Sequence, residues 1–425
     1  MSPPARILLA LLVGLLAGIA SVAAGGAWVE GAIAAAEPIG GLWLNALRMT
    51  IVPLVVSLLI TGIAASAKAA RAGRLAGRAL VLFVALLWTS AIAAALLTPL
   101  LLGLFPLPAE STAALRDALT AATPVGEAPG FADFLASIVP SNPIAAAAED
   151  AILPLILFTL VFAFALTRLP EEPRERLTLF FQALADTMLV VIGWVLWIAP
   201  VGVFALAYVV GARAGGAAFG ALLHYVAIVS AIGVLVWLAA WPLARFGGGV
   251  GFGRFTRAVA PSQAVAFSTQ SSLASLPAML RGAAALDVPV AAAGVALPMA
   301  VAIFRATGPA MNLAVAIYIA YWFGVELTPA MLAMGVAAAA ITTMGAPGIP
   351  GQASFVTSIA PICLAMGLPI EPLAILIAVE VLPDIVRTVG NVSMDVAATA
   401  TVAKRSGFTG AEADSEQDRI LEEGA

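Results

Sequence analysis

Residues 372–403 read PLAILIAVEVLPDIVRTVGNVSMDVAATATVA, a stretch apolar enough to cross a bilayer. It carries four polar side chains at helical spacing, Asp384, Arg387, Asn391 and Asp395. At about 100° per residue these four lie on one helix face, together with Thr388. Charges at membrane depth are costly and usually mark a path for a substrate or an ion. A salt bridge that locks two helices is the alternative, but the amide and hydroxyl add more recognition groups than a lock requires. We therefore expect a binding site on this face.

The composition places most of the chain in lipid. Of 425 residues, 62% are hydrophobic and only 10% are charged, and the mean hydropathy is +1.06. A soluble domain could not bury so much apolar surface. The net charge of −4 comes without a basic domain, which excludes a nucleic-acid partner. One cysteine, Cys363, and one histidine, His224, exclude an internal disulfide and a Cys- or His-rich metal site, so we expect no cofactor.

Apolar segments and basic loops predict the topology. The apolar segments are 6–27, 39–66, 79–104, 131–169, 184–211, 217–246, 256–283, 289–323, 331–368 and 371–404. The first resembles a signal peptide, but we interpret it as a retained spanning helix, because the charge pattern needs one more crossing. Basic loops such as AKAARAGRLAGR (67–78) mark the cytoplasmic side and place both termini there. This alternation closes only if 256–283 and 331–368 each enter and leave on the same side.

Both of those segments have interruptions suited to re-entrant hairpins. The first turns at STQSSLASLP (268–277) and the second at MGAPGIPG (344–351), where glycine and proline stop a continuous helix. Each is followed by one long helix, a plan typical of an inverted repeat with its binding site at the centre. Two ordinary helical hairpins with proline kinks are the alternative. The predicted fold is an all-α polytopic membrane protein with eight spanning helices and two opposed hairpins.

Three motifs carry a family resemblance: QSSLASLP (270–277), GAPGIPG (345–351) and DIVRTVGNVSMD (384–395). In this order and spacing the chain resembles the dicarboxylate/amino acid:cation symporters, which include archaeal aspartate and animal glutamate transporters. The resemblance runs from PIGGLWLNALRMTIVPLVVSLL (38–59) to TVAKRSG (401–407). It implies a homotrimer in the cell inner membrane whose transport units move like elevators against a fixed scaffold.

The resemblance also implies a division of the chain. Scaffold helices 1 and 2 would occupy 1–66, and helix 3 of the transport unit with an external loop would occupy 67–130. Scaffold helices 4 and 5 would occupy 131–211, and helix 6, hairpin 1, helix 7, hairpin 2 and helix 8 would form the transport core in 212–409. The acidic tail, 410–425, has a composition typical of disorder.

The family pattern assigns roles to individual residues. Asp384 would hold a substrate α-amino group, and Arg387 would pair the side-chain carboxylate, which suits a planar guanidinium. Asn391 would meet the α-carboxylate with Ser272. The expected substrate site comprises Ser271, Ser272, Ile349, Gly351, Asp384, Arg387, Thr388 and Asn391. The expected ion site, or its replacement, comprises Thr89, Ser90, Arg305, Asn391 and Asp395. The expected gate over the site comprises Gly345, Gly348 and Pro350.

The chain departs from the family where sodium is ligated. Relatives carry Asn-Met-Asp-Gly-Thr in the seventh helix, whereas residues 304–308 here read FRATG. Gln270 replaces a usual arginine and Leu86 a usual tyrosine. Arg305 stands in a spanning segment and needs a partner, for which Asp395 is the nearest candidate by family geometry. We expect Arg305 to act as a tethered cation in place of sodium. Alternatively, sodium stays at Asp395 and Arg305 turns toward the substrate.

These observations predict a secondary active transporter of aspartate or glutamate that depends weakly or not at all on sodium. Sodium remains a possible coupling ion, and protons could act through Glu380, Asp384 or Asp395. A C4-dicarboxylate such as succinate or malate is the alternative substrate, and a non-transporting solute receptor is the alternative class. An intramembrane hydrolase would need a base beside Ser271 or Ser272, yet the only histidine lies in another segment and no Gly-x-Ser-x-Gly occurs. We therefore do not expect an enzyme.

Overall fold

The computed structural model describes residues 3–26, 28–71, 74–107, 139–149, 151–345 and 352–406, and every regular element in them is helical. In chain order the helices are α1 (Pro3–Ala24), α2 (Trp28–Arg48), α3 (Ile51–Arg71), α4 (Arg74–Leu104), α7 (Pro143–Ala148), α8 (Ile152–Leu166), α9 (Glu171–Trp197), α10 (Ala199–Ala214), α11 (Ala217–Leu238), α12 (Ala240–Pro242), the π-helical turn η1 (Leu243–Gly247), α13 (Phe252–Thr269), α14 (Ser272–Ala285), α15 (Val290–Ile303), α16 (Thr307–Phe323), α17 (Pro329–Gly345), α18 (Gln352–Ala365), α19 (Leu373–Val379) and α20 (Val381–Arg405). Over these residues, six helical stretches are long and apolar enough to cross a membrane. The protein is therefore an integral membrane protein.

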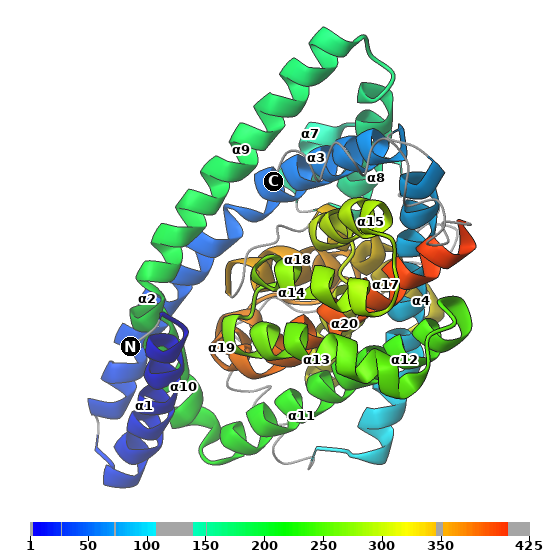
Figure 1. Ribbon diagram of the computed structural model, residues 1–425. Helices are drawn as coiled ribbons and strands as arrows, with labels where there is room; N and C mark the ends of the chain where they lie inside the picture. The colour runs from blue at the N-terminus through cyan, green and yellow to red at the C-terminus, as the bar shows by residue number, and fades with distance from the viewer. Residues whose placement is uncertain are drawn as a thin grey trace.

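An outer frame is built from α1, α2, α3 and α8–α10, which Figure 1 shows along the left side (α1, α2, α9 and α10) and the top (α3 and α8) of the molecule. Helices α1 and α10 pack backbone to backbone, because both carry glycine at the contact. A Cβ atom on Gly18 would lie 2.2 Å from the Tyr208 carbonyl oxygen, and one on Gly211 would lie 2.3 Å from that of Leu15. Small residues of this kind allow membrane helices to approach closely.

Two of the predicted spanning segments are interrupted in this frame. Segment 39–66 divides between α2 and α3, and segment 184–211 divides between α9 and α10. Proline lies in the first turn of each following helix, at Pro53 and Pro200, where its missing N–H removes no helical hydrogen bond. The prolines thus begin new helices here.

The core of the molecule is centred on α20, which packs against α4, α11, α13, α14, α15 and α16. Apart from Tyr321 and Phe323, every residue of α16 is buried, consistent with a helix that is apolar around its whole circumference. This core holds most of the charged and polar side chains discussed below.

Two helical pairs coincide with the segments predicted as hairpins. Helices α13 and α14 turn at Gln270 and Ser271, inside the expected tip, with Gln270 in the left-handed region at φ 51°. Helices α17 and α18 pack against each other, and the residues between them, 346–351, lie outside the described residues. The loop at 108–138 and the acidic tail lie outside them too.

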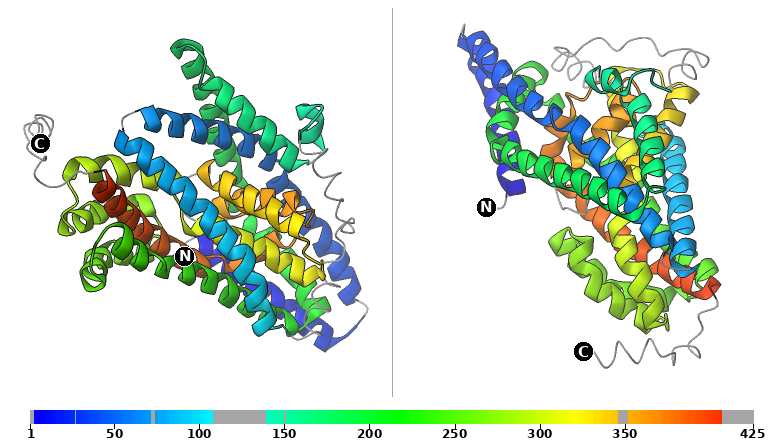
Figure 2. Two further views of the ribbon diagram at one scale, coloured as in Figure 1. Left: turned by 90° about the vertical axis from the view of Figure 1, so that its right-hand side faces the viewer. Right: turned by 90° about the horizontal axis from the view of Figure 1, so that it is seen from above.

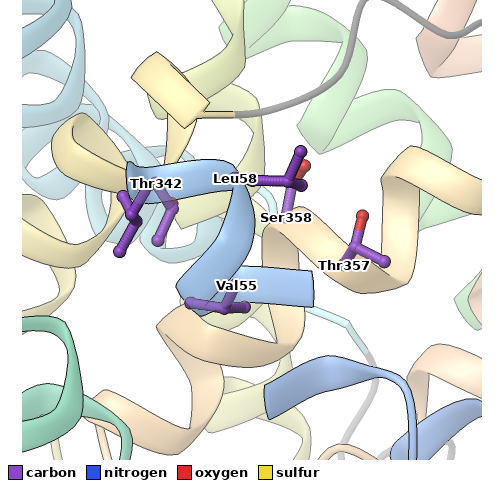
Figure 3. Close-up of a pocket in the computed structure, with 6 residues that line it drawn as sticks. Val55, Leu58, Thr342, Thr357 and Ser358 are labelled. Carbon is purple, nitrogen blue, oxygen red and sulfur yellow. The ribbon is translucent and has the colours of Figure 1, made fainter. Parts of the chain in front are cut away.

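The two pairs differ in what covers them. Helices α17 and α18 pack against α3 and α8 of the frame, whereas α13 and α14 pack mainly on each other, α15 and α20 (Figure 2). Figure 3 shows part of the first interface, where Val55 and Leu58 of α3 face Thr342 of α17 and Ser358 of α18. A pocket of only about 10 Å³ remains there. In contrast, Phe267 on the α13 side is 62% exposed.

Candidate functional site

Helix α20 buries the predicted polar face inside the core. Asp384, Thr388, Asn391 and Asp395 are 8%, 5%, 4% and 0% exposed. The helix begins directly after Glu380, which is itself only 3% exposed. Buried charges require partners or a bound ion to offset their desolvation. The partners of each group therefore define what the site can bind.

The Arg387 guanidinium is held by two other side chains. Its Nη1 donates to Asn312 Oδ1 and its Nη2 to Glu380 Oε1, each at 2.5 Å. The charge-assisted contact with Glu380 is an ion pair between α20 and the residue that precedes it. Arg387 Nε lies 3.5 Å from Asp384 Oδ1, an ion-pair distance without a hydrogen bond. Arg387 is thus fixed in place and surrounded by two carboxylates.

The expected substrate site did not include Asn312 or Glu380. Asn312 is a buried amide in the otherwise apolar sequence AMNLAVAIYIAYW of α16, and this isolation is the signal that could have revealed it. Glu380 was expected only as one of three possible proton carriers. Its second oxygen, Oε2, accepts a hydrogen bond of 3.3 Å from the Tyr225 hydroxyl of α11. The network therefore joins three helices around Arg387.

One carboxylate oxygen of Asp384 has no donor among the described residues. This atom, Oδ2, is buried. Thr388 does not serve it, because the Thr388 hydroxyl donates 2.9 Å to the backbone carbonyl of Asp384. A buried carboxylate oxygen without a donor is costly, and a substrate ammonium group would satisfy it.

Asn391 connects α20 to the break between α15 and α16. Its Oδ1 accepts hydrogen bonds from the backbone N–H of Thr307 at 3.0 Å and from the Thr307 hydroxyl at 2.8 Å. Asn391 therefore caps the first turn of α16 from a neighbouring helix. Its Nδ2 donates to no side chain or carbonyl in the described ranges, which leaves this donor available to a ligand.

The break itself, at residues 304–306, holds an aromatic pair and a cation. The Phe304 ring stacks on Phe83 of α4, with ring centroids 4.5 Å apart and planes 7° from parallel. Arg305 acts electrostatically on both Asp384 and Asp395. Asp395 was the nearest candidate partner for Arg305, but no salt bridge joins the two among the described residues, and both Asp395 oxygens lack a hydrogen-bond partner there. Arg305 affects Asp395 only at longer range.

The remaining predicted residues lie around this centre. Ser271 caps α14 by accepting from Ala274 N–H at 3.2 Å, and Ser272 begins that helix, which packs on α20. Ser90 is buried on α4, but its hydroxyl donates to the carbonyl of Leu87 in its own helix. Thr89 is exposed and likewise donates to Ala85, so the structure does not bring it to Asp395.

Most of the second predicted tip lies outside the described residues. Gly345 ends α17, and Gly348, Ile349, Pro350 and Gly351 lie outside the described residues.

A cavity of about 1030 Å³ opens beside the break, between the frame and the core. Ile303 at the end of α15 and Met344 near the end of α17 line its inner part. Polar residues on one face of α9 line its other wall: Glu171, Arg174, Glu175, Thr178, Gln182 and Asp186. The cavity therefore reaches the end of α15, directly before the break.

Other kinds of site receive no support in the part of the chain that the structure describes. No group of three or more His, Cys, Asp or Glu side chains there could hold a metal ion. His224 contacts Tyr318 Oη and the Phe105 carbonyl oxygen, both at 2.7 Å, and makes no hydrogen bond with Ser271 or Ser272. A serine–histidine pair is thus not assembled.

Comparison with known proteins identifies the family. The sodium:dicarboxylate symporter family matches residues 4–405. The proton/glutamate-aspartate symporter of Escherichia coli is 27% identical, covering 87% of this chain and 84% of the relative. The neutral amino acid transporter B(0) of Oryctolagus cuniculus is 30% identical, with 91% and 77% covered. A C4-dicarboxylate transport protein of Anaeromyxobacter is 28% identical, with 95% and 89% covered. The chain therefore belongs to the sodium:dicarboxylate symporter family.

Proposed function

We propose that this protein imports acidic amino acids, aspartate or glutamate, and that it depends weakly or not at all on sodium. The observation that carries the proposal is the pairing of unlike groups on α20. Arg387 offers a guanidinium to a carboxylate, and the free Oδ2 of Asp384 offers an acceptor to an ammonium group. A ligand with both groups satisfies both partners. The Escherichia coli relative is named a proton/glutamate-aspartate symporter.

The proposed weakness of sodium coupling rests on the break between α15 and α16. Sodium prefers oxygen ligands, and the stacked Phe304 ring supplies none. Arg305 places a fixed positive charge in electrostatic range of Asp384 and Asp395. A fixed cation there offsets part of the negative charge that a bound sodium ion would otherwise balance.

A C4-dicarboxylate is the second candidate substrate. Arg305 forms no ion pair among the described residues. Its positive charge therefore adds to that of Arg387 at the centre. A second carboxylate on the substrate could use that charge in place of an ammonium group. The Anaeromyxobacter relative, named a C4-dicarboxylate transport protein, supports this possibility.

We further propose an elevator mechanism, with the core moving against the frame. The cavity beside the break lies near the arginine-containing ends of α3 and α9, which we assign to the cytoplasm. The conformation described would then be open inward, with α17–α18 against the frame. Exposed apolar side chains on α8 and α9, such as Phe164 and Trp194, suit contact with lipid or with neighbouring protomers of a trimer.

The test is uptake of radiolabelled L-aspartate into liposomes containing the purified protein, with sodium, potassium and pH varied separately on each side. We expect uptake that is indifferent to sodium and rises with an inward proton gradient. An excess of unlabelled succinate distinguishes the second candidate, because it would compete more strongly than L-glutamate. Uptake that requires an inward sodium gradient would overturn the coupling proposal. Binding without flux would indicate a receptor.

Two variants test whether the transported substrate binds at Arg387. Arg387→Lys keeps the charge but removes the planar fork, and we expect L-aspartate uptake to fall by roughly two orders of magnitude. Arg176→Lys is the matched control, because Arg176 is exposed and pairs only with Glu172 among the described residues. Equal uptake by the two variants would show that Arg387 does not bind the substrate.

A further inference from the structure

We propose that Glu380 is the coupling-proton site, and that it takes up a proton when the substrate carboxylate displaces it from Arg387. This inference rests on the proposed function, since it requires an anionic substrate at Arg387. It goes further by assigning the proton to one of several buried acids and by giving the reason that binding and protonation are linked.

The first step concerns the space around the guanidinium. A carboxylate binds an arginine best through two parallel hydrogen bonds along one edge. The edge formed by Nη1 and Nη2 is already occupied by Asn312 and Glu380. The Nε side faces Asp384, 3.5 Å away, whose negative charge would repel a second carboxylate. A substrate carboxylate that binds along the Nη1–Nη2 edge therefore displaces Glu380.

The second step is a charge count of the centre. Without substrate, Arg305 and Arg387 face three buried carboxylates, Glu380, Asp384 and Asp395. Aspartate or glutamate adds two carboxylates and one ammonium group, which brings one more negative charge into a buried site. Uptake of one proton offsets that charge. Asp384 gains the substrate ammonium group as its partner, and Asp395 already lacks a hydrogen-bond partner among the described residues before binding. Glu380, in contrast, loses Arg387, so Glu380 is the acid whose ion pair is lost on binding.

The third step concerns what would hold the protonated acid. Glu380 is 3% exposed, so water cannot replace the lost guanidinium. Tyr225 Oη lies 3.3 Å from Oε2 and can accept as well as donate a hydrogen bond. After protonation the Glu380 hydroxyl can donate to Tyr225 Oη, so the added proton has an acceptor within the core.

The titratable groups around Glu380 are consistent with this assignment. Arg387 and Asp384 act on it from α20, and Tyr225 acts on it from α11. Elements packed nearby add Tyr318 and Tyr321 of α16, His224 of α11, Cys363 of α18, the exposed Arg6 of α1, and Tyr208 and Arg213 of α10. Arg305 at the break and Asp395 of α20 complete the charged centre, and Glu371, just before α19, is paired with Arg48. Arg213 is paired with Glu37 and is unavailable to Glu380.

The experiment measures proton uptake on substrate binding by the purified full-length protein. L-aspartate is added in weakly buffered solution with a pH indicator, and binding is measured in parallel by calorimetry. We expect about one proton for each L-aspartate bound by the wild type and close to none for Glu380→Gln, as proton linkage requires. Glu326→Gln is the control, because Glu326 is exposed between α16 and α17, and it should retain wild-type uptake.

Wild-type proton uptake in Glu380→Gln would overturn the proposal. If that variant does not fold, the pH dependence of the wild-type affinity for L-aspartate still tests the proposal. We expect this affinity to weaken as pH rises, by up to about tenfold per pH unit, and an affinity independent of pH would also overturn the proposal. A wild type that binds neither L-aspartate nor L-glutamate nor succinate would refute the proposed function itself, a result separate from Glu380.

Discussion

The two hairpins share one plan but lie in different environments. Helices α17 and α18 are buried against α3 and α8, and Ile359 and Ala360 of α18 are fully covered. Helices α13 and α14 leave large side chains such as Phe267 and Leu273 62% exposed. The sequence of α13, with two arginines and several hydroxyl side chains, suits an aqueous surface better than the alanine-rich α17. Under the elevator mechanism proposed above, this asymmetry corresponds to one end of the transport cycle, with the first hairpin free to move.

The largest effect is expected from a disulfide that links the second hairpin to the frame. Leu58 of α3 and Ser358 of α18 line the same small pocket (Figure 3). Cysteines at both positions, in a Cys363→Ala background, should form a disulfide, because both side chains line the same pocket of about 10 Å³. If the core slides past α3, uptake of L-aspartate should fall by about two orders of magnitude and recover with a reductant.

Each single-cysteine variant provides the control for that disulfide and should transport with or without oxidant. Cys363 is the only native cysteine and is buried, so its replacement removes competing thiol chemistry. Full uptake by the oxidised, cross-linked protein would show that the interface between α3 and α18 does not move.

The second prediction measures the asymmetry directly through thiol labelling. Ala264 on α13 is exposed and Ala360 on α18 is fully buried, so Ala264→Cys and Ala360→Cys form a matched pair. In the Cys363→Ala background, a water-soluble maleimide should modify position 264 at least about tenfold faster, because burial limits access to the thiolate. The rates are measured by mass spectrometry. Similar rates at both positions would mean that the two hairpins are equally covered in the membrane.

Residue spacing alone predicted the buried polar face of α20, because a helix fixes which side chains share a face. The apolar length of the segments likewise predicted a membrane protein. Spacing could not predict that Asn312 and Glu380 hold Arg387, since this contact depends on how α16 and α20 pack. The family geometry suggested a direct pair of Arg305 with Asp395, yet the structure separates them, and Phe304 stacks on Phe83 beside the break. Contacts between helices therefore needed the three-dimensional arrangement.

The smallest expected effect comes from an ion pair that spans the frame and the core. Arg48 at the end of α2 pairs with Glu371, just before α19, and both side chains are partly exposed at 40% and 22%. Partly exposed pairs contribute about 1 kcal/mol or less, so Arg48→Gln should shift the balance between inward- and outward-open states by no more than about fivefold. The shift is measured by the rate of maleimide labelling at position 264 in the Ala264→Cys protein, which should fall as the inward-open state becomes rarer. Reversing the pair with Arg48→Glu and Glu371→Arg together should restore the rate, whereas Arg48→Glu alone should lower it further. If Arg48→Gln leaves the labelling rate unchanged, the pair does not favour either state, and the asymmetry of the hairpins rests on apolar packing alone.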